Sequence, residues 1–159
     1  MGVLNVTPDS FSDGGKFNQL DLAVKHIDSM LEKCADIIDV GGESTKPGSD
    51  PVSIDEELNR VIPIINEVKK TSNDILISVD TYKSVVAEEA IKAGADIIND
   101  ISGLAFDEGM APLLAKKDIP VIIMHIQGKP KTMQQNISYD DLINDIKYYF
   151  KNRCDYAIK

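Results

Sequence analysis

Short apolar runs alternate along the chain with longer stretches in which apolar and charged positions recur at helical spacing. The short runs, rich in Ile and Val, predict strands at residues 2–5, 36–40, 75–80, 96–100 and 120–125. Runs that are apolar at nearly every position suit strands buried on both faces of a parallel sheet. The longer stretches predict helices at residues 20–33, 54–70, 84–93, 107–117 and 138–152. This alternation predicts a parallel sheet with crossover helices.

The predicted helix at residues 54–70 has the clearest start signal. Ser53 precedes it as a predicted N-cap, and Glu56 stands three residues further on, as in a capping box. Pro63 lies inside the same stretch, where a proline is expected to kink the helix.

Every predicted strand ends in residues that can form hydrogen bonds: Asn5, residues 39–43, Asp80, Asn99 with Asp100, and His125 with Gln127. In a (β/α)8 TIM barrel, such strand ends meet on the face where active sites are built. An open doubly wound sheet would concentrate function at one switch point. Five polar ends favour the barrel, of which the chain supplies about the first five strand–helix units. Periodicity alone leaves the open sheet as an alternative.

Composition and charge narrow the class of protein. The 159 residues are 43% hydrophobic, which is enough for one core, and the net charge is −9. An acidic chain is a poor partner for nucleic acid. No apolar run approaches the roughly 18–20 residues that span a bilayer, and the N-terminus does not match a signal peptide. We therefore expect no membrane partner and a cytoplasmic location, with Cys34 and Cys154 as reduced thiols.

Two long motifs resemble the signatures of the dihydropteroate synthase family. They are NVTPDSFSDGG at residues 5–15 and GGESTKPG at residues 41–48, with Lys46 where the family commonly has Arg. Shorter motifs follow in the family's order: SVDT at 78–81, IND at 98–100 and IMHIQG at 123–128. The resemblance covers essentially the whole chain. It implies one partial pterin-binding barrel domain over residues 1–159, with strands 6–8 of the barrel absent.

The resemblance also implies an activity. Family members are transferases of folate biosynthesis, targets of sulfonamides, and usually homodimers at full length. They condense 6-hydroxymethyl-7,8-dihydropterin pyrophosphate with p-aminobenzoate and release pyrophosphate. The departing pyrophosphate leaves a delocalised cation, so the protein is expected to contribute mainly positioning and electrostatics.

By resemblance, Asp80 and Asn99 hold the pyrimidine edge of the pterin and form the catalytic pair. A carboxylate can accept paired N–H groups, and a carboxamide offers both a donor and an acceptor. Met124 is expected to pack against the ring as a polarizable wall. The alternatives are that Asp80 caps the next helix, that Asn99 only ends a strand, and that Met124 is an ordinary core residue. His125 is expected to be neutral and hydrogen-bonded below the site.

The resemblance assigns the other end of the substrate to Asn5, as the protein ligand of a Mg²⁺ ion that also binds pyrophosphate and water. A turn-forming Asn is the alternative. Two loops are expected to surround p-aminobenzoate and pyrophosphate, with the residues Thr7, Pro8, Asp9, Ser10, Phe11, Thr45, Lys46 and Pro47. Lys46 supplies a cation there, although a point charge cannot reproduce the two-pronged fork of Arg.

Two other functions stay open. One is the pterin-binding domain of a methyltetrahydrofolate:corrinoid methyltransferase, which the full TPDSFSDGG loop argues against. The other is a non-catalytic half-barrel that associates with a second copy through unpaired strand edges. We also expect the 159 residues alone to lack normal synthase turnover, because the cations and the carboxylate that the family places on later strands have no counterpart here.

Overall fold

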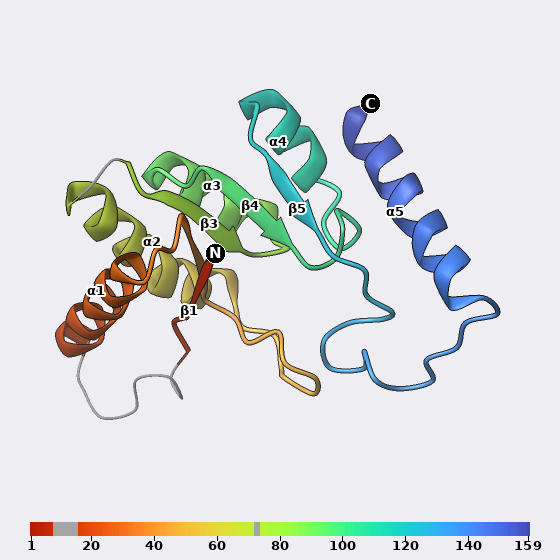
Figure 1. Ribbon diagram of the computed structural model, residues 1–159, viewed down its shortest axis with the longest axis horizontal. Helices are drawn as coiled ribbons and strands as arrows, with labels where there is room; N and C mark the ends of the chain where they lie inside the picture. Colours follow the sequence, from red (N-terminus) through yellow and green to blue (C-terminus); the bar gives the residue numbers. More distant parts are fainter. Residues whose placement is uncertain (8–15, 72–73) are drawn as a thin grey trace.

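The computed structural model describes residues 1–7, 16–71 and 74–159 (Figure 1). Strands and helices alternate in the order β1 (Gly2–Asn5), α1 (Lys16–Glu32), β2 (Ile37–Gly41), α2 (Ile54–Thr71), β3 (Leu76–Asp80), α3 (Ser84–Ala93), β4 (Ile97–Asp100), α4 (Met110–Lys117), β5 (Val121–Ile123) and α5 (Leu142–Ile158). None of these helices is long and apolar enough to cross a bilayer. Both cysteines are free and exposed, as expected.

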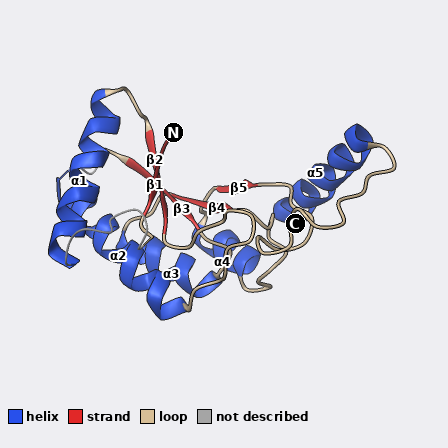
Figure 2. Ribbon diagram, turned by 90° about the horizontal axis from the view of Figure 1, so that it is seen from below, coloured by secondary structure: helices blue, strands red, loops and turns tan. Residues whose placement is uncertain are grey.

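The five strands form one parallel sheet in the order β1-β2-β3-β4-β5. Helices α1–α4 lie on one side of it (Figure 2). The strand side chains that face these helices form the buried core: Leu4, Ile38, Val40, Ile77, Val79 and Ile98. Because strand side chains alternate, their neighbours point to the other face. No helix in the described part of the chain covers that face, where Val3 stays 55% exposed. The predicted parallel α/β architecture is confirmed.

The edges of the described sheet are β1 and β5. Ile122 on β5 is also exposed on the uncovered face. Unpaired strand edges can pair with another chain. The predicted self-association through these edges stays a prediction.

The start of α2 confirms the predicted N-cap, since the Ser53 hydroxyl accepts a hydrogen bond from Glu56 N at 3.2 Å. The Glu56 carboxylate binds Arg60 on the same helix. Pro63 lies inside α2, which continues to Thr71, and the kink stays a prediction.

The predicted bounds of helices α4 and α5 are wrong. Helix α4 begins at Met110 and not at residue 107. The Asp107 carboxylate instead accepts hydrogen bonds from Gly109 N at 2.9 Å and Ser84 N at 2.7 Å. Helix α5 begins only after Asp141, whose Oδ1 accepts from Asn144 N at 3.2 Å. It then continues to Ile158, beyond the predicted end at residue 152.

The predicted bounds of β1 and α3 are confirmed, and the bounds of the remaining elements differ by one to four residues. Helix α1 begins at Lys16, earlier than predicted, β2 ends at Gly41, and β5 is shorter than predicted. Helix α5 lies at the β5 side of the sheet (Figure 1). The Tyr149 hydroxyl holds it there, since it lies within hydrogen-bond distance of two backbone oxygens, 3.0 Å from Met124 O and 3.1 Å from Ser102 O.

Candidate active site

The strand register brings three of the predicted site residues onto one row. Asn5 pairs with Gly41, Gly41 with Asp80, and Asp80 with Asn99. Residues paired across parallel strands project to the same face, so all three polar side chains lie on the face opposite the helices. The row lies at or next to the carboxyl ends of its strands, where the predicted barrel places its chemistry.

Gly41 leaves open space in the middle of this row. A Cβ atom built there would lie 3.4 Å from Asn5 Oδ1 and 3.7 Å from Asp80 Oδ2. Any side chain at this position would therefore occupy the space between the two polar groups. The glycine allows a flat ligand to approach the backbone of β2 closely.

Asp39 lies one step below the row on the same face, paired in register with Ser78. Its Oδ2 accepts a hydrogen bond from Asn99 Nδ2 at 3.1 Å. With its amide nitrogen directed to Asp39, Asn99 has its carbonyl oxygen free to act as an acceptor. Asp39 is one of the polar strand ends that the sequence predicts, but no role was predicted for it. The available signal was a carboxylate inside an otherwise apolar run.

Three buried oxygens on this face lack a hydrogen-bond partner among the described residues: Asp39 Oδ1, Ser78 Oγ and Asp80 Oδ1. An unsatisfied buried polar group costs about 1–3 kcal/mol, so such groups are rare in folded proteins. Three of them on neighbouring strands indicate a place that binds donors from outside the chain. Ligand N–H groups or water would satisfy them.

The environment of Asp80 opposes its negative charge. Burial raises the pKa of its carboxyl to about 7, and the negative charges of Asp39, Glu57, Asp100 and Glu43 contribute to the same rise. A ligand that donates hydrogen bonds to the carboxylate, or that carries positive charge beside it, would lower this pKa again. The ionisation of Asp80 is thus sensitive to such a ligand near neutral pH.

Asp80 does not cap helix α3, which was the alternative role. At the start of α3, Lys83 N donates to Thr81 Oγ1 at 3.2 Å. Ser84 N donates to the Asp107 carboxylate. Other side chains therefore satisfy these amides of the first turn, and Asp80 stays directed to the uncovered face.

The segment after β5 carries Met124 and His125. Met124 is half-buried, and its backbone oxygen binds Tyr149. Its contact with a pterin stays a prediction. The His125 ring lies 4.7 Å from the Tyr149 ring and 5.9 Å from the Tyr139 ring, measured between centroids. Its described contacts are thus aromatic, and the expected hydrogen bond is not among them.

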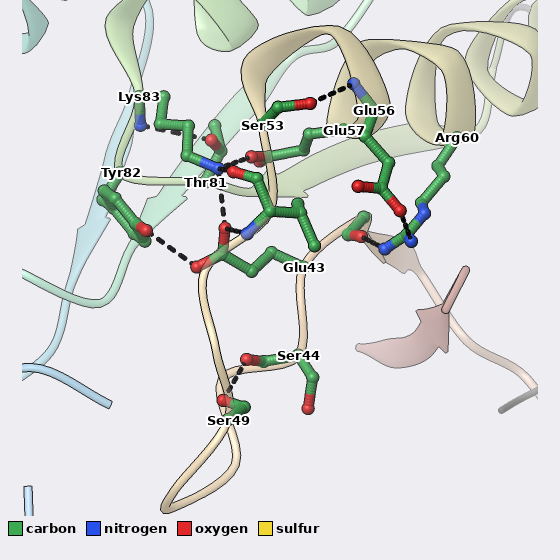
Figure 3. Close-up of polar contacts among 12 residues, drawn as sticks. Glu43, Ser44, Ser49, Ser53, Glu56, Glu57, Arg60, Thr81, Tyr82 and Lys83 are labelled. Carbon is green, nitrogen blue, oxygen red and sulfur yellow. Dashed lines mark hydrogen bonds and ion pairs between the residues drawn. The ribbon is translucent and has the colours of Figure 1, made fainter. Parts of the chain in front are cut away.

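The loop after β2 carries Thr45, Lys46 and Pro47. The Ser49 hydroxyl closes the tip of this loop at 2.5 Å from Ser44 O and 2.7 Å from Lys46 O (Figure 3). The side chain of Lys46 is exposed.

The same loop contacts the segment after β5. Gly48 N donates to Pro130 O at 3.0 Å, and Lys131 Nζ lies 2.5 Å from Asp50 Oδ1. No pattern in the sequence predicts this contact between segments about 80 residues apart. The other predicted loop starts at Thr7, which is half-buried. Its residues Pro8, Asp9, Ser10 and Phe11 lie outside the described residues.

The described part of the chain contains no group of three or more His, Cys, Asp or Glu side chains that could hold a metal ion. No such cluster in this part of the chain could therefore enclose a Mg²⁺ ion. Mg²⁺ commonly keeps waters and binds one or two protein ligands together with substrate phosphates. The Asn5 side-chain oxygen, at the edge of the row, fits a single ligand of that kind.

Comparison with known proteins agrees with this geometry. A family model described as "Pterin binding enzyme" matches residues 1–159. Dihydropteroate synthase of Clostridium beijerinckii is 51% identical over 100% of this chain and 58% of the relative. The Escherichia coli K12 enzyme is 50% identical over 99% of this chain and 56% of the relative. The chain thus spans little more than half the length of these two curated relatives.

Solved structures support the fold. The dihydropteroate synthase of Clostridium difficile, crystallised in the presence of pteroic acid, superimposes with a TM-score of 0.90 at 51% identity, over 99% of this chain and 57% of that one. The Yersinia pestis enzyme in a sulfonamide drug complex gives 0.89 at 47% identity, with coverages of 99% and 57%. These neighbours are TIM-barrel proteins, so the predicted barrel units are confirmed. The chain belongs to the family of pterin-binding enzymes.

Proposed function

We propose that this chain forms the pterin-binding part of a dihydropteroate synthase. The reaction joins 6-hydroxymethyl-7,8-dihydropterin pyrophosphate to p-aminobenzoate and releases pyrophosphate. The observation that carries the proposal is the row of Asn5, Asp80 and Asn99 on one face, with Asp39 orienting Asn99 from below. The relatives that carry this name, the solved enzyme crystallised in the presence of pteroic acid and the one in a sulfonamide drug complex support it.

Asp80 and Asn99 act on the pyrimidine side of the pterin in this proposal. The Asp80 carboxylate accepts paired N–H groups, and Asn99 presents its carbonyl oxygen because its amide nitrogen is bound to Asp39. The ring lies above Gly41, where no side chain intervenes. When pyrophosphate leaves, the negative charge of Asp80 stabilises the resulting cation in a site of low dielectric. Met124 is proposed as an apolar wall of the ring pocket.

The other substrate groups are assigned to the two loops. Asn5 is proposed as the protein ligand of Mg²⁺, which would neutralise charge on the pyrophosphate when bound. The residues proposed to surround p-aminobenzoate and pyrophosphate are Thr7, Pro8, Asp9, Ser10, Phe11, Thr45, Lys46 and Pro47. The exposed ammonium of Lys46 attracts the carboxylate of p-aminobenzoate or the phosphate oxygens.

Release of pyrophosphate tests the proposal. The protein expressed from its complete coding sequence is mixed with the pterin pyrophosphate, p-aminobenzoate and Mg²⁺, and free pyrophosphate is measured. We expect release that requires both substrates. Methyl transfer from methyltetrahydrofolate to a corrinoid, without pyrophosphate release, would establish the methyltransferase alternative. The 159 residues alone are expected to show no normal turnover.

A further inference from the structure

A buried cluster of charges lies under the loop after β2. The ammonium of Lys83 lies 2.6 Å from Glu43 Oε2 and 2.5 Å from Glu57 Oε2, and it donates to Val52 O at 2.8 Å (Figure 3). These three acceptors use all three hydrogens of the ammonium. The Lys83 side chain is 13% exposed, while Glu43 and Glu57 are 5% and 1% exposed. Burial alone would lower the pKa of Lys83, but the hydrogen bonds to Glu43 and Glu57 outweigh it and raise that pKa.

Glu43 has further partners that fix its position. The Tyr82 hydroxyl donates to Glu43 Oε1 at 2.7 Å, and Val52 N donates to Glu43 Oε2 at 3.0 Å. Glu43 opens the loop after β2, and Val52 closes it just before α2. Lys83 therefore contacts both limbs of the loop at its base and connects them to Glu57 on α2.

Near the tip of the loop, Gly48 N donates to Pro130 O in the segment after β5, and the other contact with that segment is a weaker support. The ion pair between Asp50 and Lys131 joins side chains that are 76% and 63% exposed. Exposed pairs of this kind contribute little to stability because water and salt screen them. At the base of the loop, every partner of Lys83 and Glu43 is buried or half-buried. These contacts are therefore expected to restrict the position of the loop more than the exposed Asp50–Lys131 pair does.

We propose that Lys83 is a positioning residue for the loop that carries Thr45, Lys46 and Pro47. By closing the base between Glu43 and Val52, it holds these side chains at a fixed distance from the row of Asp80 and Asn99. This inference rests on the proposed function, because it gives the loop its role in binding the arylamine substrate. Lys83 touches neither substrate in this account and acts only through Glu43 and Val52.

The choice of variant follows from the chemistry of the cluster. Lys83→Met would leave two buried carboxylates without a cation, which is strongly destabilising. Lys83→Arg keeps the charge, but a planar fork cannot place hydrogens on the same three acceptors. Tyr82→Phe is milder, since it removes only one hydroxyl from Glu43. Lys69→Met is the matched control, because Lys69 is 15% exposed and binds Asp96 at 2.9 Å and Ile75 O at 2.8 Å, near the amino ends of the strands.

Steady-state kinetics on the protein expressed from its complete coding sequence tests the inference. We expect Lys83→Arg to raise KM for p-aminobenzoate about tenfold and Tyr82→Phe to raise it a few-fold, with KM for the pterin substrate unchanged within about twofold. Lys69→Met should lower the melting temperature and leave both KM values unchanged. The inference is overturned if Lys83→Arg leaves KM for p-aminobenzoate unchanged, if both KM values rise together, or if Lys69→Met gives the same change.

Hydrogen exchange separates a failure of this inference from a failure of the proposed function. If the unmodified protein shows no turnover, the proposed function is wrong, and exchange at the amides of residues 44–51 still tests the role of Lys83. We expect faster exchange there in Lys83→Arg and Tyr82→Phe and no change in Lys69→Met. Equal exchange in all variants would overturn the inference.

Discussion

Asn99 Nδ2 donates to Asp39 Oδ2 at 3.1 Å, and this contact directs the Asn99 carbonyl oxygen away from Asp39. A carboxamide can face a ligand with either end, but a carboxylate oxygen accepts only hydrogens. Asp39 therefore orients the side chain, and Asn99 and Asp80 both present acceptors to the uncovered face. A ligand that matches this pair must present N–H donors along one edge, as the pyrimidine side of a pterin does.

Removing the Asn99 side chain should weaken pterin binding. We expect Asn99→Ala to raise the Kd for pteroic acid about tenfold to a hundredfold, because one hydrogen bond is lost and Asp39 loses its partner. Isothermal titration measures the change. Asn59→Ala, at an exposed position of α2, is the control and should bind as the unmodified protein does. Equal affinities for Asn99→Ala and the control would contradict the assignment of Asn99.

Gly41→Ala should impair binding without impairing folding. The added methyl group would meet Asn5 and Asp80 at 3.4–3.7 Å, which is ordinary contact, but it would fill the space assigned to the ring. We expect an unchanged or slightly higher melting temperature and at least about tenfold weaker pterin binding.

Gly42→Ala is the contrasting variant. A Cβ there would lie 2.8 Å from Val61 Cγ2 and 3.0 Å from Glu57 Cγ, in the layer between the sheet and α2. This variant should lower the melting temperature because the added atom overpacks the core. If Gly41→Ala binds pterin normally, the ring does not lie above Gly41.

Pterin affinity should depend on pH through Asp80. The pKa of the free carboxyl is raised to about 7, and a ligand that donates N–H groups binds the ionised form. The sign is therefore fixed: affinity rises as pH increases toward 7, by up to about tenfold per pH unit, and levels off above it. Titrations between pH 5.5 and about 8.5 measure the curve. In Asp80→Asn the affinity should be low at every pH, and a curve like that of the unmodified protein would contradict the role of Asp80.

Asp39→Asn should shift this curve to lower pH. After burial, the negative charge of Asp39 is the largest cause of the raised pKa of Asp80. Neutralising it should lower the midpoint by about one unit. The same titrations measure the midpoint, with Asp36→Asn, exposed just before β2, as the control. A midpoint that stays in place, or moves to higher pH, would show that Asp39 does not influence Asp80.

The row of site residues could be predicted because it depends on a simple rule. Parallel strands end at the same edge of a sheet, so polar residues at the ends of successive apolar runs come together. Asn5, Asp80 and Asn99 follow this rule, and the register confirms their shared face. The N-cap at Ser53 was equally local, since it depends on residues within one helical turn.

The contacts that support the row could not be predicted in the same way. Asn99 and Asp39 are 60 residues apart, and Lys83 lies 40 and 26 residues from Glu43 and Glu57. None of these residues indicates its distant partner in the sequence, and only the folded chain brings the partners together. The start of α5 was predicted too early, at residue 138. Asp141 is the N-cap, and Ser and Asp residues can both cap a helix, so the sequence does not fix which of them does so.

A structure of the protein with bound pteroic acid tests the central claim most directly. We predict that the pyrimidine edge lies above Gly41, within about 3.2 Å of the Asp80 carboxylate and the Asn99 carbonyl oxygen. A ring bound elsewhere, with Asp80 and Asn99 free of contact, would contradict the account. So would the failure of the protein to bind the ligand at all.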